Sequence, residues 1–151
     1  MITFRSWTEQ DVQMLAETER ACFADPWSQE MLQTEMSYSA ACGVIAEEDG
    51  QMIGFAYGKI YFEEGELYKI GILPNLRGKG VGKALYKFWE EQIKARGGRT
   101  VFLEVRVSNA SAIGLYTKEG YAQTRVREHY YADGEACFEM KKELFTDAEG
   151  E

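Results

Sequence analysis

The fold of this chain is decided by the stretch Ile70-Gly71-Ile72-Leu73-Pro74-Asn75-Leu76-Arg77-Gly78-Lys79-Gly80-Val81-Gly82-Lys83-Ala84-Leu85. It begins with an apolar, β-branched run that ends at Pro74, continues as a loop with glycine at every second position, and becomes amphipathic at Ala84. This pattern predicts a strand, a glycine-rich loop and a helix N-terminus. Glycines let successive peptide N–H groups converge, and the first helical turn adds N–H groups without intrahelical partners. Such a loop favours a phosphate-bearing ligand.

The spacing of this loop argues against the two common nucleotide-binding motifs. A Walker loop ends in Gly-Lys-Ser/Thr, whereas here Gly82-Lys83 is followed by Ala84, which has no hydroxyl for magnesium. The dinucleotide fingerprint is G-x-G-x-x-G, whereas this loop has G-x-G-x-G. Arg77, Lys79 and Lys83 surround the loop with positive charge, so a phosphate remains the expected ligand. The alternative is a glycine-rich turn that binds nothing.

Length and composition indicate one small domain. The 151 residues fit a single domain, expected over residues 1–145 with an acidic tail at residues 146–151. The three cysteines share no metal-like spacing, so neither a zinc site nor a disulfide framework is expected. The chain has no apolar run long enough to span a membrane, and we expect a cytoplasmic protein that is a monomer or a weak dimer.

Charge is unevenly distributed along the chain. The net charge of −8 argues against a nucleic-acid surface, which needs a clustered basic footprint. Residues 1–70 contain four Lys/Arg against thirteen Asp/Glu, whereas residues 71–151 contain thirteen against twelve. If the first half forms an acceptor pocket, its charge would steer a cationic acceptor towards it. The alternative is that these carboxylates are solvated groups that only keep the protein soluble.

The hydrophobic periodicity predicts an α/β chain. Strands are expected at residues 2–5, 41–47, 52–62, 66–73, 100–107, 121–131 and 135–144, and helices at residues 8–25, 28–36, 84–96 and 109–118. Asp49-Gly50 and Asp133-Gly134 predict two-residue hairpin turns. The strand, helix and strand around the glycine-rich loop predict one parallel, right-handed pair.

Glu104 is the candidate general base. It interrupts the apolar strand Leu103-Glu104-Val105, where an ionised carboxylate is costly unless it has a partner or a use. A protein α-amine has an ordinary pKa of about 7.7–8.0, against about 10.4 for lysine. One carboxylate therefore suffices to accept the proton of an α-amine. The alternative is that Glu104 forms a salt bridge to Arg106 or another cation.

Two motifs resemble those of the GNAT superfamily of acyl-CoA N-acyltransferases. Arg77, Gly80 and Gly82 match its Arg/Gln-x-x-Gly-x-Gly/Ala signature, and Asn109 and Tyr116 match its Asn-x-x-Ala-x-x-Leu-Tyr segment. The expected order of strands and helices is similar as well, so the resemblance covers nearly the whole chain. It implies the GNAT fold, a mixed and mostly antiparallel seven-stranded sheet flanked by about four helices, with acetyl-CoA as co-substrate.

The resemblance also implies roles for the site residues. Strand N–H groups near Ile72 would polarise the acetyl carbonyl, Asn109 would contact the pantetheine arm, and Glu104 would be the base. Tyr116 would be the acid for the leaving thiolate, a transfer that a phenol of pKa near 10 can make. The expected donor-site residues are Ile70, Ile72, Arg77, Gly78, Lys79, Gly80, Val81, Gly82, Lys83 and Asn109. The amine would attack the thioester directly, because no cysteine lies near these motifs in the sequence.

Further segments resemble the RimI family, which acetylates the N-terminal alanine of a small-subunit ribosomal protein. They are Cys22-Phe23-x-Asp25-Pro26-Trp27-Ser28, Leu103-Glu104-Val105-Arg106 and Arg127-x-x-Tyr130-Tyr131-x-x-Gly134-Glu135. The implied acceptor is the N-terminus of a basic ribosomal protein, with Trp27, Tyr130 and Tyr131 at its site. Gly78 departs from the family, which usually has a basic residue after Arg77.

Two alternatives to this function remain open from the sequence. One is a GNAT enzyme that acetylates a small amine or a protein lysine. The other is a non-catalytic module that binds acyl-CoA. At the level of single residues, Trp27 is equally compatible with a place in the core, and Tyr130 and Tyr131 are equally compatible with ordinary strand aromatics.

Overall fold

The computed structural model describes residues 1–145, which contain seven strands and four α-helices. The strands are β1 (Ile2–Ser6), β2 (Ala41–Glu48), β3 (Gln51–Tyr61), β4 (Glu64–Ile72), β5 (Thr100–Arg106), β6 (Ala122–Arg127) and β7 (Cys137–Glu143). The helices are α1 (Val12–Cys22), α2 (Gln29–Met36), α3 (Val81–Ala95) and α4 (Ala110–Lys118), with short 3-10 helices at Glu9–Asp11 and Pro74–Leu76. The predicted order of elements is confirmed.

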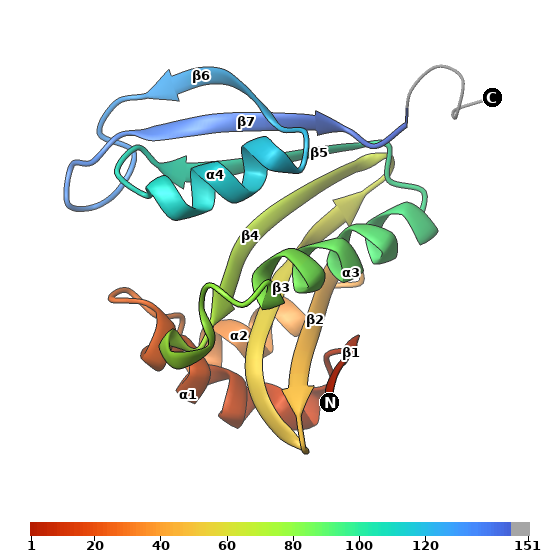
Figure 1. Ribbon diagram of the computed structural model, residues 1–151. Helices are drawn as coiled ribbons and strands as arrows, with labels where there is room; N and C mark the ends of the chain where they lie inside the picture. The colour runs from red at the N-terminus through yellow and green to blue at the C-terminus, as the bar shows by residue number, and fades with distance from the viewer. Residues whose placement is uncertain (146–151) are drawn as a thin grey trace.

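One sheet joins all seven strands in the order β1-β2-β3-β4-β5-β7-β6. Every neighbouring pair is antiparallel except β4 and β5, which are parallel and connected through α3. Figure 1 shows β4 and β5 side by side at one end and separating towards the other. The sheet is therefore mixed and mostly antiparallel, as predicted, and it is open between its two central strands.

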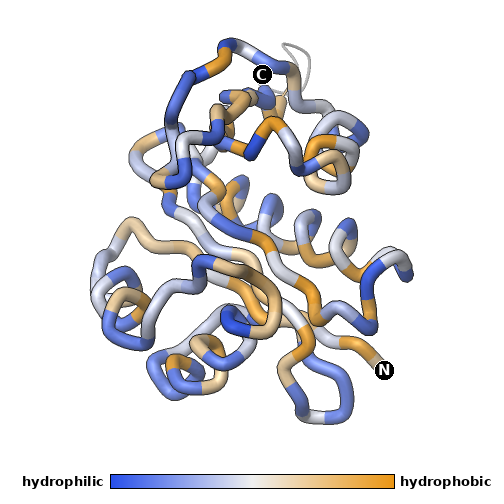
Figure 2. The backbone as a smooth tube through the Cα atoms, turned by 90° about the vertical axis from the view of Figure 1, so that its left-hand side faces the viewer, coloured by the Kyte–Doolittle hydropathy of each residue, from blue (hydrophilic) through white to orange (hydrophobic). Residues whose placement is uncertain are grey.

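Local sequence signals explain where the helices begin and end. The Thr8 N–H donates to Asp11 Oδ2 at 2.7 Å at the entry to α1, and Ser28 Oγ accepts from the Met31 N–H at 3.1 Å at the start of α2. The helix α3 starts after Gly80 and is followed by Gly97, both with positive φ. The helices show alternating hydrophobic and hydrophilic segments along the tube in Figure 2, as expected for helices that cover a sheet on one side.

The sheet separates two hydrophobic clusters. The larger cluster includes Leu85 and Trp89 of α3 with Leu103 of β5, all almost fully buried. The smaller cluster lies under α1 and α2 and includes Leu15 and Tyr57. Helices α3 and α4 therefore cover one face, and α1 and α2 cover the other face of the first strands. The other face of β5 is left without a helix of its own.

A bulge in β4 directs the strand away from β5. Tyr57 of β3 pairs with Lys69 while Gly58 pairs with Leu67, so Tyr68 is an extra residue on β4. Leu67 packs into the cluster under α3, whereas both Tyr68 and Lys69 face α1 and α2. The pairing of β4 with β5 stops at Leu67, opposite Leu103. The part of β4 beyond Leu67 forms one side of the opening in the sheet.

The predicted final hairpin is partly wrong. Its two strands pair as predicted, but β6 ends at Arg127 and β7 begins at Cys137, so Asp133-Gly134 does not form a two-residue hairpin turn. The Tyr131 N–H donates to the Glu135 carbonyl at 3.1 Å, which closes a separate small turn inside a longer loop. The side chains of Asp133 and Glu135 bond to Arg106, which holds the loop against β5. Contacts to a distant strand thus override the local turn signal.

The expected acidic tail, residues 146–151, lies outside the described residues. Within residues 1–145, none of the helices is both long and apolar enough to span a membrane.

Candidate active site

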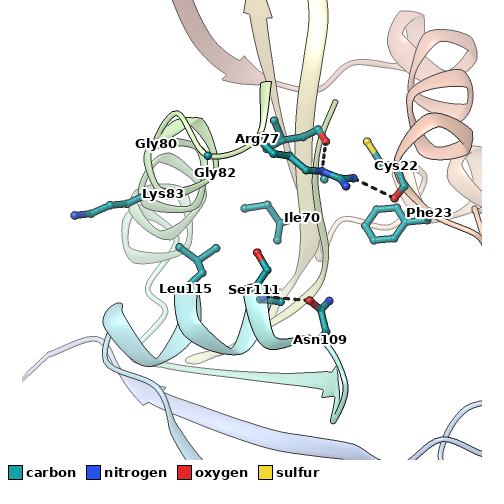
Figure 3. A pocket seen from close by; sticks show the side chains of 14 residues that line it. Cys22, Phe23, Ile70, Arg77, Gly80, Gly82, Lys83, Asn109, Ser111 and Leu115 are labelled. Carbon is teal, nitrogen blue, oxygen red and sulfur yellow. Dashed lines mark hydrogen bonds between the residues drawn. The ribbon is translucent and has the colours of Figure 1, made fainter. Parts of the chain in front are cut away.

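The opening between β4 and β5 contains a pocket of about 430 Å³. Its walls come from the end of α1, the last residues of β4, the glycine-rich loop and the start of α4 (Figure 3). Eight of the predicted donor-site residues line it: Ile70, Ile72, Arg77, Gly78, Gly80, Gly82, Lys83 and Asn109. The structure therefore brings together residues from the loop and from α4 that are far apart in the chain.

The glycine-rich loop presents backbone to this pocket. Gly78 and Gly80 have φ of 80° and 82°, a left-handed conformation that favours glycine, and Gly80 is the N-cap of α3. A Cβ at either position would meet no atom within 4 Å, so the backbone is open to a ligand. The N–H groups of the first turn of α3 have no intrahelical acceptors and carry the positive end of the helix dipole. This end of the loop suits an anion.

The three basic residues of the loop, Arg77, Lys79 and Lys83, are placed differently relative to the pocket. Arg77 Nε donates to the Ile72 carbonyl at 3.1 Å, and its Nη2 donates to the Cys22 carbonyl at 3.4 Å, so its guanidinium lies across the pocket wall (Figure 3). The side chain of Lys83 extends away from the other labelled side chains in the same view. Lys79 is exposed, and Val81, the first residue of α3, is buried in the larger hydrophobic cluster, so neither lines the pocket.

The free edge of β4 offers peptide N–H groups to the pocket. The Leu73 N–H donates to the Ile53 carbonyl of β3 at 3.0 Å. N–H groups alternate in direction along a strand, so those of Ile70 and Ile72 point away from β3, towards the side where β5 has separated. The Ile72 carbonyl, on that same side, is the one that Arg77 contacts. This edge has the two donors that an oxyanion would need.

Helix α4 forms the opposite wall. Asn109 is its N-cap, and Asn109 Oδ1 accepts from the Ala112 N–H at 3.1 Å, which fixes the side chain at the pocket (Figure 3). Ser111 and Leu115 lie on the same wall. Asn109 therefore combines a capping role with a place at the predicted donor site.

Tyr116 lies behind this wall and does not line the pocket itself. Its ring is 94% buried and packs edge to face against Tyr121, with centroids 5.6 Å apart. Burial raises the pKa of the Tyr116 phenol well above its ordinary value, and Tyr131 adds to that effect. The hydroxyl thus stays protonated at neutral pH, which an acid requires.

Glu104 faces the other side of the sheet. Its neighbours Leu103 and Val105 are buried under α3 and α4, so the Glu104 side chain points to the opposite face, where it is half-buried. Burial raises its pKa first, the negative charge of Glu66 raises it further, and Arg127 opposes both effects. No salt bridge to Glu104 is present among residues 1–145, and Arg106 instead pairs with Asp25, Asp133 and Glu135. The salt-bridge alternative is not supported.

The three predicted acceptor residues lie outside the pocket wall. Trp27 is half-buried and packs edge-on against Tyr57, with centroids 5.1 Å apart, at the rim of the smaller cluster. Tyr130 and Tyr131 lie in the loop between β6 and β7, not on a strand, with centroids 5.0 Å apart. Burial raises the pKa of Tyr131 to about 12. These residues belong to the face on which Glu104 lies, apart from the donor pocket.

Six lining residues are missing from the predicted site: Cys22, Phe23, Gly71, Ser111, Ala112 and Leu115. The last three follow Asn109 within the same motif, which was a usable signal. Cys22 and Phe23 come from the end of α1, and although they begin one of the segments that resemble the RimI family, that segment was assigned to the acceptor site through Trp27. The expectation that no cysteine lies near the motifs is therefore wrong, because Cys22 lies beside them in the folded structure. Burial raises the pKa of the Cys22 thiol, so it is a poor nucleophile and direct attack by the amine remains the simpler chemistry.

Among residues 1–145, no His/Cys/Asp/Glu cluster suits a metal ion.

Comparison with known proteins agrees with this architecture. The chain matches the Acetyltransferase (GNAT) family model over residues 12–121. It is 30% identical over 131 residues to the ribosomal protein bS18-alanine N-acetyltransferase of Escherichia coli (strain K12), covering 87% of this chain and 88% of that protein. It is 36% identical over 121 residues to the enzyme of the same name from Haemophilus influenzae, covering 80% and 82%. The crystal structure of the ribosomal-protein-S18-alanine N-acetyltransferase from Escherichia coli superposes with a TM-score of 0.90 at 29% identity, covering 97% of this chain and 96% of that one. The chain belongs to the GNAT family of acetyltransferases.

Proposed function

We propose that this protein transfers the acetyl group of acetyl-CoA to the N-terminal α-amine of a small-subunit ribosomal protein that begins with alanine. The observation that carries the proposal is the opening between β4 and β5, which has an anion-binding loop on one face and the half-buried Glu104 carboxylate on the other. The names of the relatives from Escherichia coli and Haemophilus influenzae support the choice of acceptor.

Acetyl-CoA fits the pocket by its chemistry. Its pyrophosphate would lie on the N–H groups of the loop from Arg77 to Lys83, where glycine backbone and the α3 dipole favour negative charge. The pantetheine arm, which is neutral and amide-rich, would run between the free edge of β4 and Asn109 of α4. The acetyl carbonyl would then meet the N–H groups of Ile70 and Ile72.

Two side chains of the protein would accept and donate the protons that move during the transfer. The amine nitrogen forms a bond to the thioester carbonyl carbon and the C–S bond breaks, so one proton leaves nitrogen and one must reach sulfur. Glu104, kept partly desolvated, would accept the first proton directly or through water. Tyr116, kept neutral by burial, would supply the second. The N–H groups of Ile70 and Ile72 would stabilise the negative charge on the carbonyl oxygen while it lasts.

The charge of the acceptor face supports a basic peptide. Glu66 of β4 and Glu139 of β7 flank Glu104 on this face, and each raises the pKa of Glu104 by its negative charge. Asp25 and Asp133 on the two bordering loops pair with Arg106, and Glu139 pairs with Arg125 and Arg127. Within the described residues Glu104 has no ion pair, so its carboxylate would attract the positively charged N-terminus of a peptide.

The test is acetylation of matched peptides. Thiol release from acetyl-CoA is measured with a basic peptide beginning Ala-Arg and with the same peptide carrying a blocked N-terminus and an internal lysine, and mass spectrometry locates the acetyl group. Acetylation of the free N-terminus alone is the expected result. Acetylation of the blocked peptide would redirect the function to lysines, and activity on neither peptide would overturn the proposed acceptor.

A further inference from the structure

The guanidinium of Arg106 joins the two loops that border the Glu104 face. From the last position of β5, it lies 3.5 Å from Asp25 Oδ2 in the loop between α1 and α2. It also lies 2.8 Å from Asp133 Oδ2 and 3.0 Å from Glu135 Oε1 in the loop between β6 and β7. The same guanidinium stacks on Tyr131, with its central carbon 4.0 Å from the ring centroid. We call Arg106 and these four partners the Arg106 cluster.

The cluster spans the opening in the sheet. Arg106 follows Glu104 by two positions on β5, so both side chains point to the same face. At this level β4 and β5 are no longer paired, since their ladder ends at Leu67 and Leu103. The contact between Arg106 and Asp25 therefore connects structure on the β4 side of the opening to structure on the β5 side.

Asp25 is held from the β4 side as well. Lys69 Nζ donates to the Asp25 carbonyl at 3.0 Å and to Glu19 Oε1 at 3.0 Å. Glu19 is fully buried and also accepts a hydrogen bond from the Tyr57 hydroxyl. The β4 bulge is what places Lys69 on this face. The backbone of Asp25 is therefore fixed by a buried network, and its side chain is left to meet Arg106.

Arg106 contacts one loop through Asp133 and Glu135 and the other loop through Asp25, and we call these contacts the two arms of the cluster. The two arms differ in strength. The contacts to Asp133 and Glu135 are short, and Glu135 Oε2 also accepts from the Ser108 N–H at 3.0 Å, so this arm is fixed. The contact to Asp25 is longer, and the Asp25 side chain is 68% exposed. Exposed ion pairs contribute little to stability. Asp133 is similarly exposed, but Asp133 and Glu135 also accept from backbone N–H groups, so the Asp25 contact is the weaker of the two.

We propose that Arg106 is a positioning residue for the acceptor peptide. It holds the loop that carries Tyr131 against β5, and its contact with Asp25 closes the face across which the peptide backbone reaches Glu104. This inference rests on the proposed function, because it takes the Glu104 face as the acceptor side. The Arg106 side chain does not line the donor pocket, and Arg106 meets a lining residue only through its carbonyl, which accepts from the Asn109 N–H at 3.0 Å and is kept in a side-chain substitution. The effect of changing the side chain is therefore expected on the acceptor.

The test compares Arg106→Gln with the control Arg96→Gln. Arg96 also joins a loop to secondary structure, donating to the carbonyls of Ser39 at 2.7 Å and Ala41 at 2.8 Å, but at another part of the molecule. For Arg106→Gln, the KM for an alanine-led peptide is expected to rise about tenfold while the KM for acetyl-CoA is unchanged, as loss of a charged contact predicts. Asp25→Asn should give a smaller rise, with little further effect in the double variant. Arg96→Gln should leave both KM values unchanged.

A second readout does not depend on the acceptor. Hydrogen exchange of the free protein should become faster at residues 23–28 and 128–136 in Arg106→Gln, and at residues 23–28 alone in Asp25→Asn. Unchanged exchange at both loops, or equal rises in the KM for peptide and for acetyl-CoA, would overturn the role of Arg106. If the wild-type protein acetylates no peptide N-terminus, the proposed function fails, and exchange alone then decides whether Arg106 holds the two loops.

Discussion

The rings of Tyr116 and Tyr121 lie edge to face with centroids 5.6 Å apart, but their hydroxyl groups have different surroundings. The Tyr121 hydroxyl lies 2.7 Å from the hydroxyl of Tyr86, in a buried hydrogen bond. The Tyr116 hydroxyl has no hydrogen-bond partner within the part of the chain that the structure describes. The Tyr121 hydroxyl thus contributes to the core, whereas the Tyr116 hydroxyl has capacity left for a substrate atom.

This difference predicts separate effects of removing each hydroxyl. Tyr116→Phe should lower kcat by about 10²-fold or more, as expected for loss of a general acid, with the KM for acetyl-CoA and the Tm unchanged. Tyr121→Phe should leave kcat near the wild-type value and lower stability by about 1 kcal/mol, a Tm decrease of about 2–4 °C. Steady-state kinetics and thermal melts of the two variants check this. A Tyr116→Phe enzyme with wild-type kcat would remove Tyr116 from the mechanism.

The environment of Glu104 predicts the pH dependence of the rate. A base must be ionised, so the rate should fall as the pH decreases through the pKa of Glu104, which burial and Glu66 raise above the ordinary carboxyl range. Glu104→Gln should lower kcat by about 10²-fold or more and remove this acidic limb. Rates measured between pH 5 and pH 9 check this. A Gln variant that keeps the wild-type profile would exclude Glu104 as the base.

Glu66 offers a finer test of the same pKa. Its negative charge is the second cause of the raised pKa of Glu104, after burial. Glu66→Gln should therefore move the acidic limb to lower pH without abolishing the rate. Glu64 is exposed on the same strand and is not among the causes of the shift, so Glu64→Gln is the matched control and should leave the limb in place. Equal shifts in both variants would indicate a general effect of net charge.

The same carboxylate should reduce stability at neutral pH. A carboxyl group whose pKa is raised in the folded state stabilises folding below its unfolded pKa, and that contribution is lost as the pH rises through the folded value. The Tm of Glu104→Gln should therefore exceed that of the wild type at pH 7 and approach it at pH 4. Melting curves at the two pH values measure the difference. A Gln variant less stable than the wild type at pH 7 would contradict a desolvated Glu104.

The sequence predicted those parts of the site that depend on local chemistry. The unit of β4, glycine-rich loop and α3 follows from Pro74, the alternating glycines and the apolar face of the helix, and the structure forms this unit with α3 beginning at Val81 and not at the predicted Ala84. The motif that contains Asn109 and Tyr116 predicted the place of Asn109 at the α4 wall, whereas Ser111, Ala112 and Leu115 of the same segment were missed. The order of strands and helices could also be predicted, because it depends on local sequence patterns.

The parts that depend on distant contacts could not be predicted in this way. Asp133-Gly134 is a strong local hairpin signal, but Arg106 and the Ser108 N–H draw the neighbouring carboxylates into a longer loop. Cys22 lines the pocket at a place where Arg77 contacts its carbonyl, and a contact between residues 55 positions apart does not follow from local sequence. The bulge at Tyr68 opens the sheet, and its position depends on pairing with β3.

A pair of glycines allows backbone strain to be separated from ligand binding. Gly80 and Gly50 have φ of 82° and 81°, and a Cβ on either would meet no atom within 4 Å. Alanine at either position should cost about 1–2 kcal/mol of stability, because L-residues avoid this conformation. Only Gly80 of these two lines the donor pocket. Gly80→Ala should therefore weaken acetyl-CoA binding about tenfold or more, because its methyl group obstructs the approach of phosphate to the backbone.

Calorimetric titration of acetyl-CoA into the two folded variants, at a temperature well below both melting transitions, measures this prediction. Gly50→Ala should bind acetyl-CoA with the wild-type Kd, because Gly50 lies in the turn between β2 and β3 and does not line the pocket. If both variants lost affinity equally, the loss would follow from strain in the fold. If Gly80→Ala bound acetyl-CoA normally, the pyrophosphate would have to lie elsewhere than on the backbone around Gly80. A selective loss in Gly80→Ala would connect the alternating glycines of the loop before α3 to the binding of the donor.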